Sequence, residues 1–172
     1  MNLRDEILKE HSRRQALKIA AWIDNSEEKF GMLLDLFLHD EYRVVQRSAW
    51  TISVIGEKYP ALIKKYLKKL VYRMGDKSAP VAVKRNVTRV LQFIDIPVKL
   101  QAKVMNICFE FLTDPKETIA VRVFSMTVLA NLAKQYPDIK NEVEQTVNLQ
   151  LKNPTPGLTV RARRVLKELS EL

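Results

Sequence analysis

The residue types that most often carry catalysis or metal binding are few and scattered in this chain. Its 172 residues contain two histidines, His11 and His39, and one cysteine, Cys108. Neither histidine has a cysteine or a second histidine nearby at the spacing of zinc ligands. Cys108 stands between two apolar residues, which is typical of a buried, inert thiol rather than a nucleophile. We therefore expect no metal, no cofactor and no catalytic residue.

A glycine-rich nucleotide-binding loop is also missing, because the four glycines are isolated from one another. Gly56 follows a helical pattern, and we interpret it as a signal for the C-terminal end of a helix. Gly31 falls inside a predicted helix, where the missing side chain would allow close packing.

Positive charge is the strongest chemical signal. The net charge is +9, and the segment between Lys58 and Lys103 alone holds twelve Lys or Arg against two acids. One basic group, Lys64 to Lys69, falls on a single face of one helix, as a solvated outer surface would. The residues that we expect to contact a partner or phosphate groups are Arg47, Trp50, Lys84, Arg85, Arg89, Arg122 and Arg161.

The two tryptophans, Trp22 and Trp50, are expected in the core or at its edge. An exposed Trp50 close to Arg47 would instead suit a binding groove.

A repeat of 38 residues organises the elements that must position these groups. Three stretches share apolar residues at their first and eighth positions and a small or β-branched residue at the fifth. These spacings place the three residues on one face of a helix. The six apolar positions, all expected to be buried, are Val45, Ile52, Val83, Val90, Val121 and Val128.

Prolines separate one helix pair from the next. Pro60, Pro97 and Pro137 each precede a predicted pair, since proline fits the first turn of a helix and disfavours helix in the residue before it. The predicted helices span residues 3–10, 12–23, 27–38, 43–57, 61–74, 80–94, 98–112, 118–134, 138–151 and 158–170.

With these features the chain resembles the HEAT-repeat family. The resemblance is carried by an acid or amide in the turn of a pair and a base eight positions later: Asp76 with Lys84, Asp114 with Arg122, and Asn153 with Arg161. It implies an all-α fold, a right-handed α-α superhelix (a HEAT-like solenoid) of about five helix pairs. It also implies that these six residues form a structural ladder within and between repeats.

The resemblance further implies one HEAT-like domain over residues 1–172. Its repeats are expected at approximately 1–24, 26–58, 60–95, 97–135 and 137–172. A single pair cannot bury its apolar face, so neighbouring pairs must stack.

Two functions compete. The first is a non-enzymatic scaffold that presents an extended basic surface to a protein partner with an acidic surface. The alternative is nucleic-acid binding, with DNA phosphates on the concave face that second helices line in this family, as in the HEAT-like DNA alkylation-repair glycosylases. The chain lacks a convincing Trp/Asp/Arg pocket set for such a glycosylase, so we expect no enzyme, with a glycosylase-like activity as the alternative.

The beginning of the chain and its hydropathy predict a cytoplasmic protein that does not bind membranes. Asp5 and Glu6 stand where an export signal needs its apolar core, and no apolar run approaches the ~20 residues of a membrane span.

Overall fold

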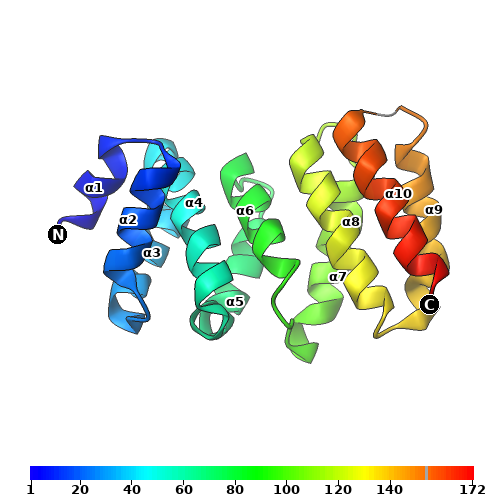
Figure 1. Cartoon of the computed structure of the whole chain (residues 1–172), viewed down its shortest axis with the longest axis horizontal. Coiled ribbons are helices and arrows are strands. Elements are labelled where there is room, and N and C mark those ends of the chain that lie inside the picture. Colours follow the sequence, from blue (N-terminus) through cyan, green and yellow to red (C-terminus); the bar gives the residue numbers. More distant parts are fainter. Residues whose placement is uncertain (154) are drawn as a thin grey trace. The chain divides into compact units, whose positions relative to one another are not determined.

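The computed structural model describes residues 1–153 and 155–172, and these form helices without any strand (Figure 1). The all-α prediction is confirmed. The chain groups into two compact units, which we call unit 1 (Met1–Ile94) and unit 2 (Asp95–Leu172). The division lies within one residue of the expected end of the third repeat. The expectation that residues 1–172 make a single domain stays a prediction.

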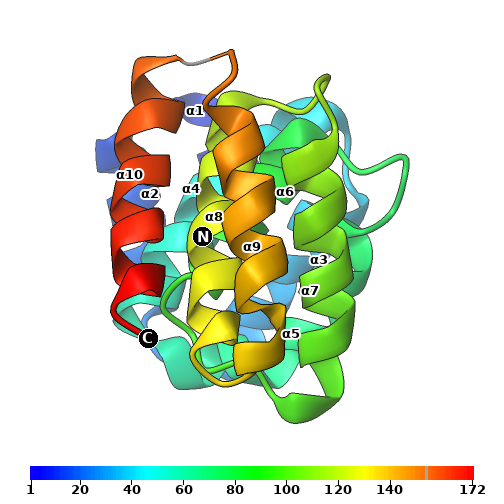
Figure 2. The same cartoon turned by 90° about the vertical axis from the view of Figure 1, so that its right-hand side faces the viewer.

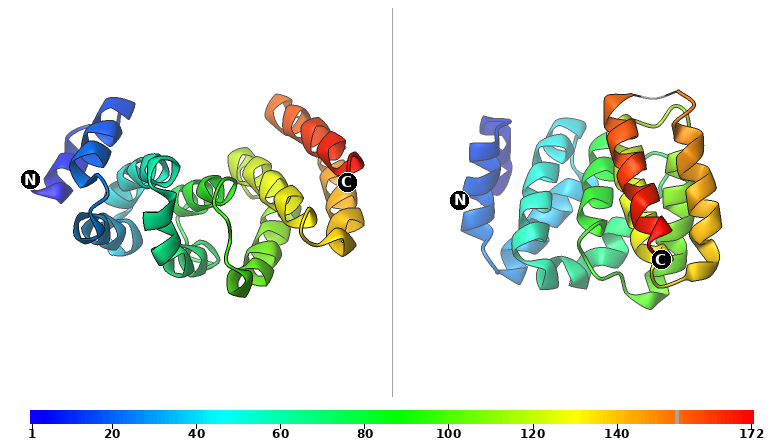
Figure 3. Two further views of the ribbon diagram at one scale, coloured as in Figure 1. Left: turned by 60° about the horizontal axis from the view of Figure 1, so that its bottom comes forward. Right: turned by 45° about the vertical axis from the view of Figure 1, so that its right-hand side comes forward.

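Unit 1 is built from three helix pairs. Its helices are α1 (Leu3–Lys9), α2 (Arg13–Ile23), α3 (Glu27–His39), α4 (Tyr42–Lys58), α5 (Pro60–Met74) and α6 (Val81–Leu91). The second helices of the pairs, α2, α4 and α6, pack in that order along one side, while α3 and α5 lie along the other (Figure 3). We call the side formed by α2, α4 and α6 the second-helix face of unit 1.

Unit 2 is centred on one helix. Its elements are α7 (Val98–Thr113), α8 (Ile119–Ala133), the 3₁₀-helix η1 (Pro137–Ile139), α9 (Lys140–Gln150) and α10 (Pro156–Ser170). Helix α8 packs against α7, α9 and α10, and α9 lies beside α10 (Figure 2). Most residues of α8 are buried or half-buried, which agrees with an apolar helix enclosed by three neighbours.

The helices begin at local signals in the sequence. The hydroxyls of Ser12 and Ser26 accept backbone N–H groups in the first turns of α2 and α3. Pro60 opens α5, Pro97 caps α7 and Pro137 opens η1, so the predicted separation of pairs by proline is confirmed.

The predicted repeat register is confirmed by burial. All six positions expected in the core, from Val45 to Val128, are at most 2% exposed. The predicted helix bounds agree with the structure to within three residues. The largest of these differences is at α6, which ends at Leu91 instead of residue 94, because Gln92 and Phe93 donate to carbonyls three residues back and tighten the last turn.

The interpretation of the two helical glycines is corrected by their surroundings. Gly56 is no helix end, because α4 continues to Lys58. A Cβ atom at Gly56 would lie 3.0 Å and 3.3 Å from the two γ-methyl carbons of Val90 on α6. At Gly31 such a Cβ would have no atom within 4 Å apart from the adjacent residues and the backbone of its own helix. Close helix packing therefore depends on Gly56 and not, as expected, on Gly31.

Candidate binding pocket

A pocket of about 340 Å³ opens between α4 and α6 of unit 1, beside the α1–α2 junction. Polar, aromatic and small apolar side chains contribute to its wall. The lining residues are His11, Tyr42, Gln46, Trp50, Val81, Ala82, Arg85, Asn86 and Arg89. The pocket therefore belongs to the second helices of neighbouring pairs.

Helix α4 supplies one wall through three residues at successive four-residue spacings. Tyr42, Gln46 and Trp50 fall on one helix face because residues four apart are neighbours on a helix. Tyr42 is 61% exposed, whereas Trp50 is half-buried. The imidazole of His11 meets the Trp50 ring edge to face, with centroids 6.0 Å apart and planes at 85°. Trp50 therefore combines the predicted core-edge position with a place in the wall of the pocket.

Helix α6 supplies the opposite wall and its positive charge. Asn86 is fixed there, because its Oδ1 accepts from the Ser53 hydroxyl at 2.8 Å and its amide donates to the Ala82 carbonyl. The guanidinium of Arg89 donates to Glu57 at 2.8 Å.

Arg85 differs from its neighbour Arg89, one turn away on the same helix. It is exposed, and no hydrogen bond or ion pair joins its side chain to any residue in the described part of the chain. Arg85 therefore brings an uncommitted guanidinium to the pocket, with donors arranged to bind a carboxylate in pairs.

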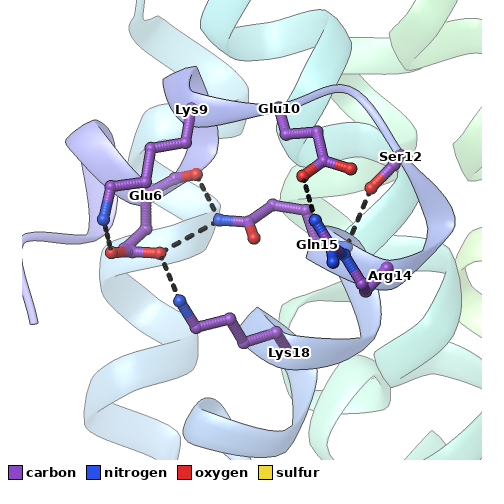
Figure 4. A network of polar contacts seen from close by, with 7 residues as sticks. All are labelled: Glu6, Lys9, Glu10, Ser12, Arg14, Gln15 and Lys18. Carbon is purple, nitrogen blue, oxygen red and sulfur yellow. Dashed lines mark hydrogen bonds and ion pairs between the residues drawn. The ribbon is translucent and has the colours of Figure 1, made fainter.

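A carboxylate network stabilises the junction that carries His11. Glu6 on α1 is only 9% exposed and accepts hydrogen bonds from Lys9, Lys18 and Gln15 (Figure 4). The Lys18 and Gln15 side chains come from α2, so the network ties the two helices together. The hydrogen bond from Lys9, followed by those from Lys18 and Gln15, lowers the pKa of Glu6 to about 2.

The structure gathers only part of the predicted contact set. Trp50, Arg85 and Arg89 line the pocket. Arg47 and Lys84 are half-buried on α4 and α6 outside the lining, and Arg47 donates to the backbone carbonyl of Leu8. Arg47 thus has a structural partner, and its role in contacting a partner stays a prediction.

The two predicted contact residues in unit 2 also have structural partners. Arg122 donates to the side chain of Gln150 on α9, and Arg161 donates to the hydroxyl of Thr127 on α8. Both arginines are half-buried. Each arginine thus bonds to a neighbouring helix of unit 2, and the predicted contact roles of both stay predictions.

Asp76 and Asp114 have local partners, and the ladder implied by the resemblance stays a prediction. Asp76 accepts from the backbone N–H of Ser78 at 2.9 Å and pairs with Arg73. Asp114 is exposed and accepts from the backbone N–H of Lys116 at 2.9 Å, while Arg122 bonds elsewhere. Both acids therefore stabilise their turns through a bond to the residue two positions on. The rung between Asn153 and Arg161 likewise stays a prediction.

The lysine face of α5 does not contribute to the pocket. Lys64, Lys65, Lys68 and Lys69 are all exposed, on a first helix. Lys65 pairs with Glu27 on α3 at 2.6 Å.

The remaining candidates for chemistry stand apart from the pocket. Cys108 is fully buried, and this burial raises the pKa of its thiol to about 12, while His39 is exposed. Among the described residues, no group of three or more His, Cys, Asp or Glu could hold a metal ion. In the same part of the chain, no helix has the length and apolar character to span a membrane.

Comparison with known families completes the description. A model of the HEAT repeat domain matches residues 3–169, which is nearly the whole chain. The chain belongs to the HEAT-repeat family. The predicted all-α solenoid is thus confirmed, and HEAT repeats typically act as non-catalytic scaffolds for protein interactions. No curated protein and no solved structure matched the chain.

Proposed function

We propose that this HEAT-repeat chain is a non-catalytic scaffold that holds an acidic segment of a protein partner on the second-helix face of unit 1. The observation that carries the proposal is the uncommitted guanidinium of Arg85 in a pocket walled by Trp50. Aromatic residues and arginine are the side chains most often enriched where protein partners bind.

The distribution of charge supports an acidic partner. Unit 1 carries eighteen Lys or Arg and eleven Asp or Glu, a net charge of +7, whereas unit 2 carries eleven and nine, a net charge of +2. A positive field on one unit attracts an acidic segment and speeds its association, with an effect that declines as salt screens the charges.

The basic side chains that are already bonded within the protein favour a protein segment over a nucleic-acid backbone as the ligand. A run of phosphates needs several cations in a row, but Arg47 is bonded to the Leu8 carbonyl and Arg89 is paired with Glu57. The Glu57 carboxylate also repels phosphates near Arg89. One acidic side chain, in contrast, needs only Arg85.

Site-specific photo-crosslinking tests the proposal. A photoreactive amino acid is placed at Gln46, which is exposed at the pocket, and separately at Lys69, which is exposed on α5. In the source cell, we expect the probe at position 46, but not the one at position 69, to crosslink to a defined protein through an acidic segment. Crosslinks to nucleic acid, or equal crosslinking from both positions, would contradict the proposal.

A salt titration tests the nucleic-acid alternative directly. The scaffold predicts weak filter retention of short duplex and single-stranded DNA that vanishes near physiological salt. Phosphate binding at the pocket would instead persist at physiological salt. The slope of log affinity against log salt concentration would then become shallower by about two in Arg85→Ala/Arg89→Ala, one for each lost phosphate contact.

A further inference from the structure

The pocket combines hydrogen-bond donors, unpaired in the described part of the chain, with exposed apolar surface, and this combination restricts the ligands that fit it. Resting on the proposed function, we infer that it takes two side chains of one extended peptide segment: a carboxylate that binds Arg85 and a nearby aromatic ring that packs against Trp50.

The carboxylate half of this motif follows from an excess of hydrogen-bond donors. In the described part of the chain, no hydrogen bond or ion pair engages the side chains of Arg85, Gln46 or Tyr42, and all three line the pocket. An ionised carboxylate accepts several hydrogen bonds at once and pairs bidentately with a guanidinium. The Glu57 carboxylate beside Arg89 disfavours a second anion, so one acidic side chain satisfies the site.

The aromatic half follows from the apolar part of the wall. Trp50 is half-buried with its ring held by the edge-to-face contact with His11, and Val81 on the facing helix is 43% exposed. Covering exposed apolar surface of this kind is favourable, and an aromatic pair is stabilised beyond the area that it buries. A ring from the partner can cover Trp50 and Val81 together.

The dimensions fit a short segment. A pocket of about 340 Å³ is at the low end of the range of roughly 300–1,000 Å³ that ligand sites span. Trp50 and Arg85 stand on facing helices, whose axes lie about 8–10 Å apart when helices pack. Since an extended chain advances about 3.3 Å per residue, the acidic and aromatic residues must lie within about three positions of each other.

Selection from a random peptide library displayed against the whole protein tests the inference. We expect the enriched peptides to carry Asp or Glu within three positions of Trp, Tyr or Phe. A synthetic peptide from this pool should bind at physiological salt, and its affinity should fall at least about tenfold with Arg85→Gln, since a hydrogen bond to a charged group contributes about 1.5–3 kcal/mol. Lys69→Gln is the matched control: it removes the same charge from α5 and should leave the affinity unchanged.

The position of the peptide is read from Trp50 itself. The chain has two tryptophans, so Trp22→Phe leaves Trp50 as the only indole, and peptide binding should then change its emission. Trp50→Phe should retain most of the affinity and Trp50→Leu should lose it, with thermal melts showing that both variants fold.

The possible failures are distinguishable. Peptides that bind without changing Trp50 emission, or that bind Arg85→Gln as tightly as the parent, would overturn the pocket motif and leave the scaffold function standing. Enriched peptides without an acid or an aromatic residue would do the same. Displacement of the peptide by a short single-stranded DNA at physiological salt would overturn both the motif and the protein-scaffold proposal.

Discussion

Adding one methyl group should stabilise the protein at one of the two helical glycines of unit 1 and not at the other. Alanine is favoured over glycine inside a helix by about 1 kcal/mol. Gly31→Ala should gain this amount, because its new Cβ meets nothing within 4 Å apart from the adjacent residues and the backbone of its own helix. At Gly56 the Cβ would lie 3.0 Å from a methyl carbon of Val90, well inside the optimal carbon–carbon separation of about 3.5–4.0 Å.

Val90 cannot easily move away from that methyl group. It is 0% exposed, and a valine in a helix has one strongly preferred rotamer. Overpacking of this kind destabilises by about 1–3 kcal/mol, which offsets or exceeds the helix gain. We therefore expect Gly56→Ala to be less stable than Gly31→Ala by roughly 2 kcal/mol, the sum of the lost gain and the net clash.

Urea unfolding followed by tryptophan fluorescence measures the difference, because Trp22 and Trp50 both belong to unit 1. Val90→Ala provides the internal test, since it removes the two methyl groups that the Gly56→Ala Cβ would meet. Combined with Gly56→Ala, it should destabilise by at least about 1 kcal/mol less than the two single effects added together. The packing argument would be refuted if Gly31→Ala and Gly56→Ala were equally stable. It would also be refuted if the effects of Gly56→Ala and Val90→Ala on the free energy of unfolding were strictly additive.

Three further outcomes follow from burial and charge. Val90→Asp should abolish the helical circular dichroism signal of unit 1, because an unpaired buried charge costs several kcal/mol, about the scale of total stability. A thermal melt like that of the parent would show that the repeat register is wrong. Glu6→Gln should remove a stabilising contribution that is complete above about pH 4.5 and disappears as the pH falls through the lowered pKa of Glu6, about 2. The urea midpoints of the parent and the variant should therefore converge near pH 2. A difference between the two midpoints that grows toward acid pH would contradict this. Cys108, whose thiol pKa burial raises to about 12, should react with a thiol reagent at pH 8 only as fast as the protein opens, so immediate modification would disprove its burial.

The helices and the core could be predicted from sequence because both depend on short-range spacing. Val45, Val83 and Val121 recur every 38 residues, and apolar positions four and three apart can share only one helix face. The glycines were misread for the opposite reason. What a Cβ at Gly56 would meet depends on Val90, which is 34 positions away in the sequence and on another helix.

Local turn chemistry accounts for the partners that Asp76 and Asp114 have. Asp76 and Asp114 each have a backbone N–H two residues on, and this donor is available as soon as the turn forms. Arg122 donates to the side-chain amide oxygen of Gln150 on the next helix, and the spacing of charges along the chain cannot predict this contact.

The pocket could be predicted only in part. Trp50, Arg85 and Arg89 were identified from their repeat positions, whereas Tyr42 and Gln46 were missed although they share a helix face with Trp50 at four-residue steps. That spacing was the available signal. Tertiary contacts bring in His11, Ser53 and Glu57, and no local sequence pattern predicts such contacts.

The enclosure of α8 has a consequence for how the protein is made. The helix is covered by α7 on one part of its circumference and by α9 and α10 on others, and the latter two follow it in the chain. During synthesis α8 therefore leaves the ribosome before two of the three helices that shield it. Helices α2 and α4 of unit 1, in contrast, pack against α1, α3, α5 and α6, which all belong to residues 1–94. Unit 1 can close early, while an apolar helix of unit 2 stays open to chaperones or to association with other chains until α10 has emerged.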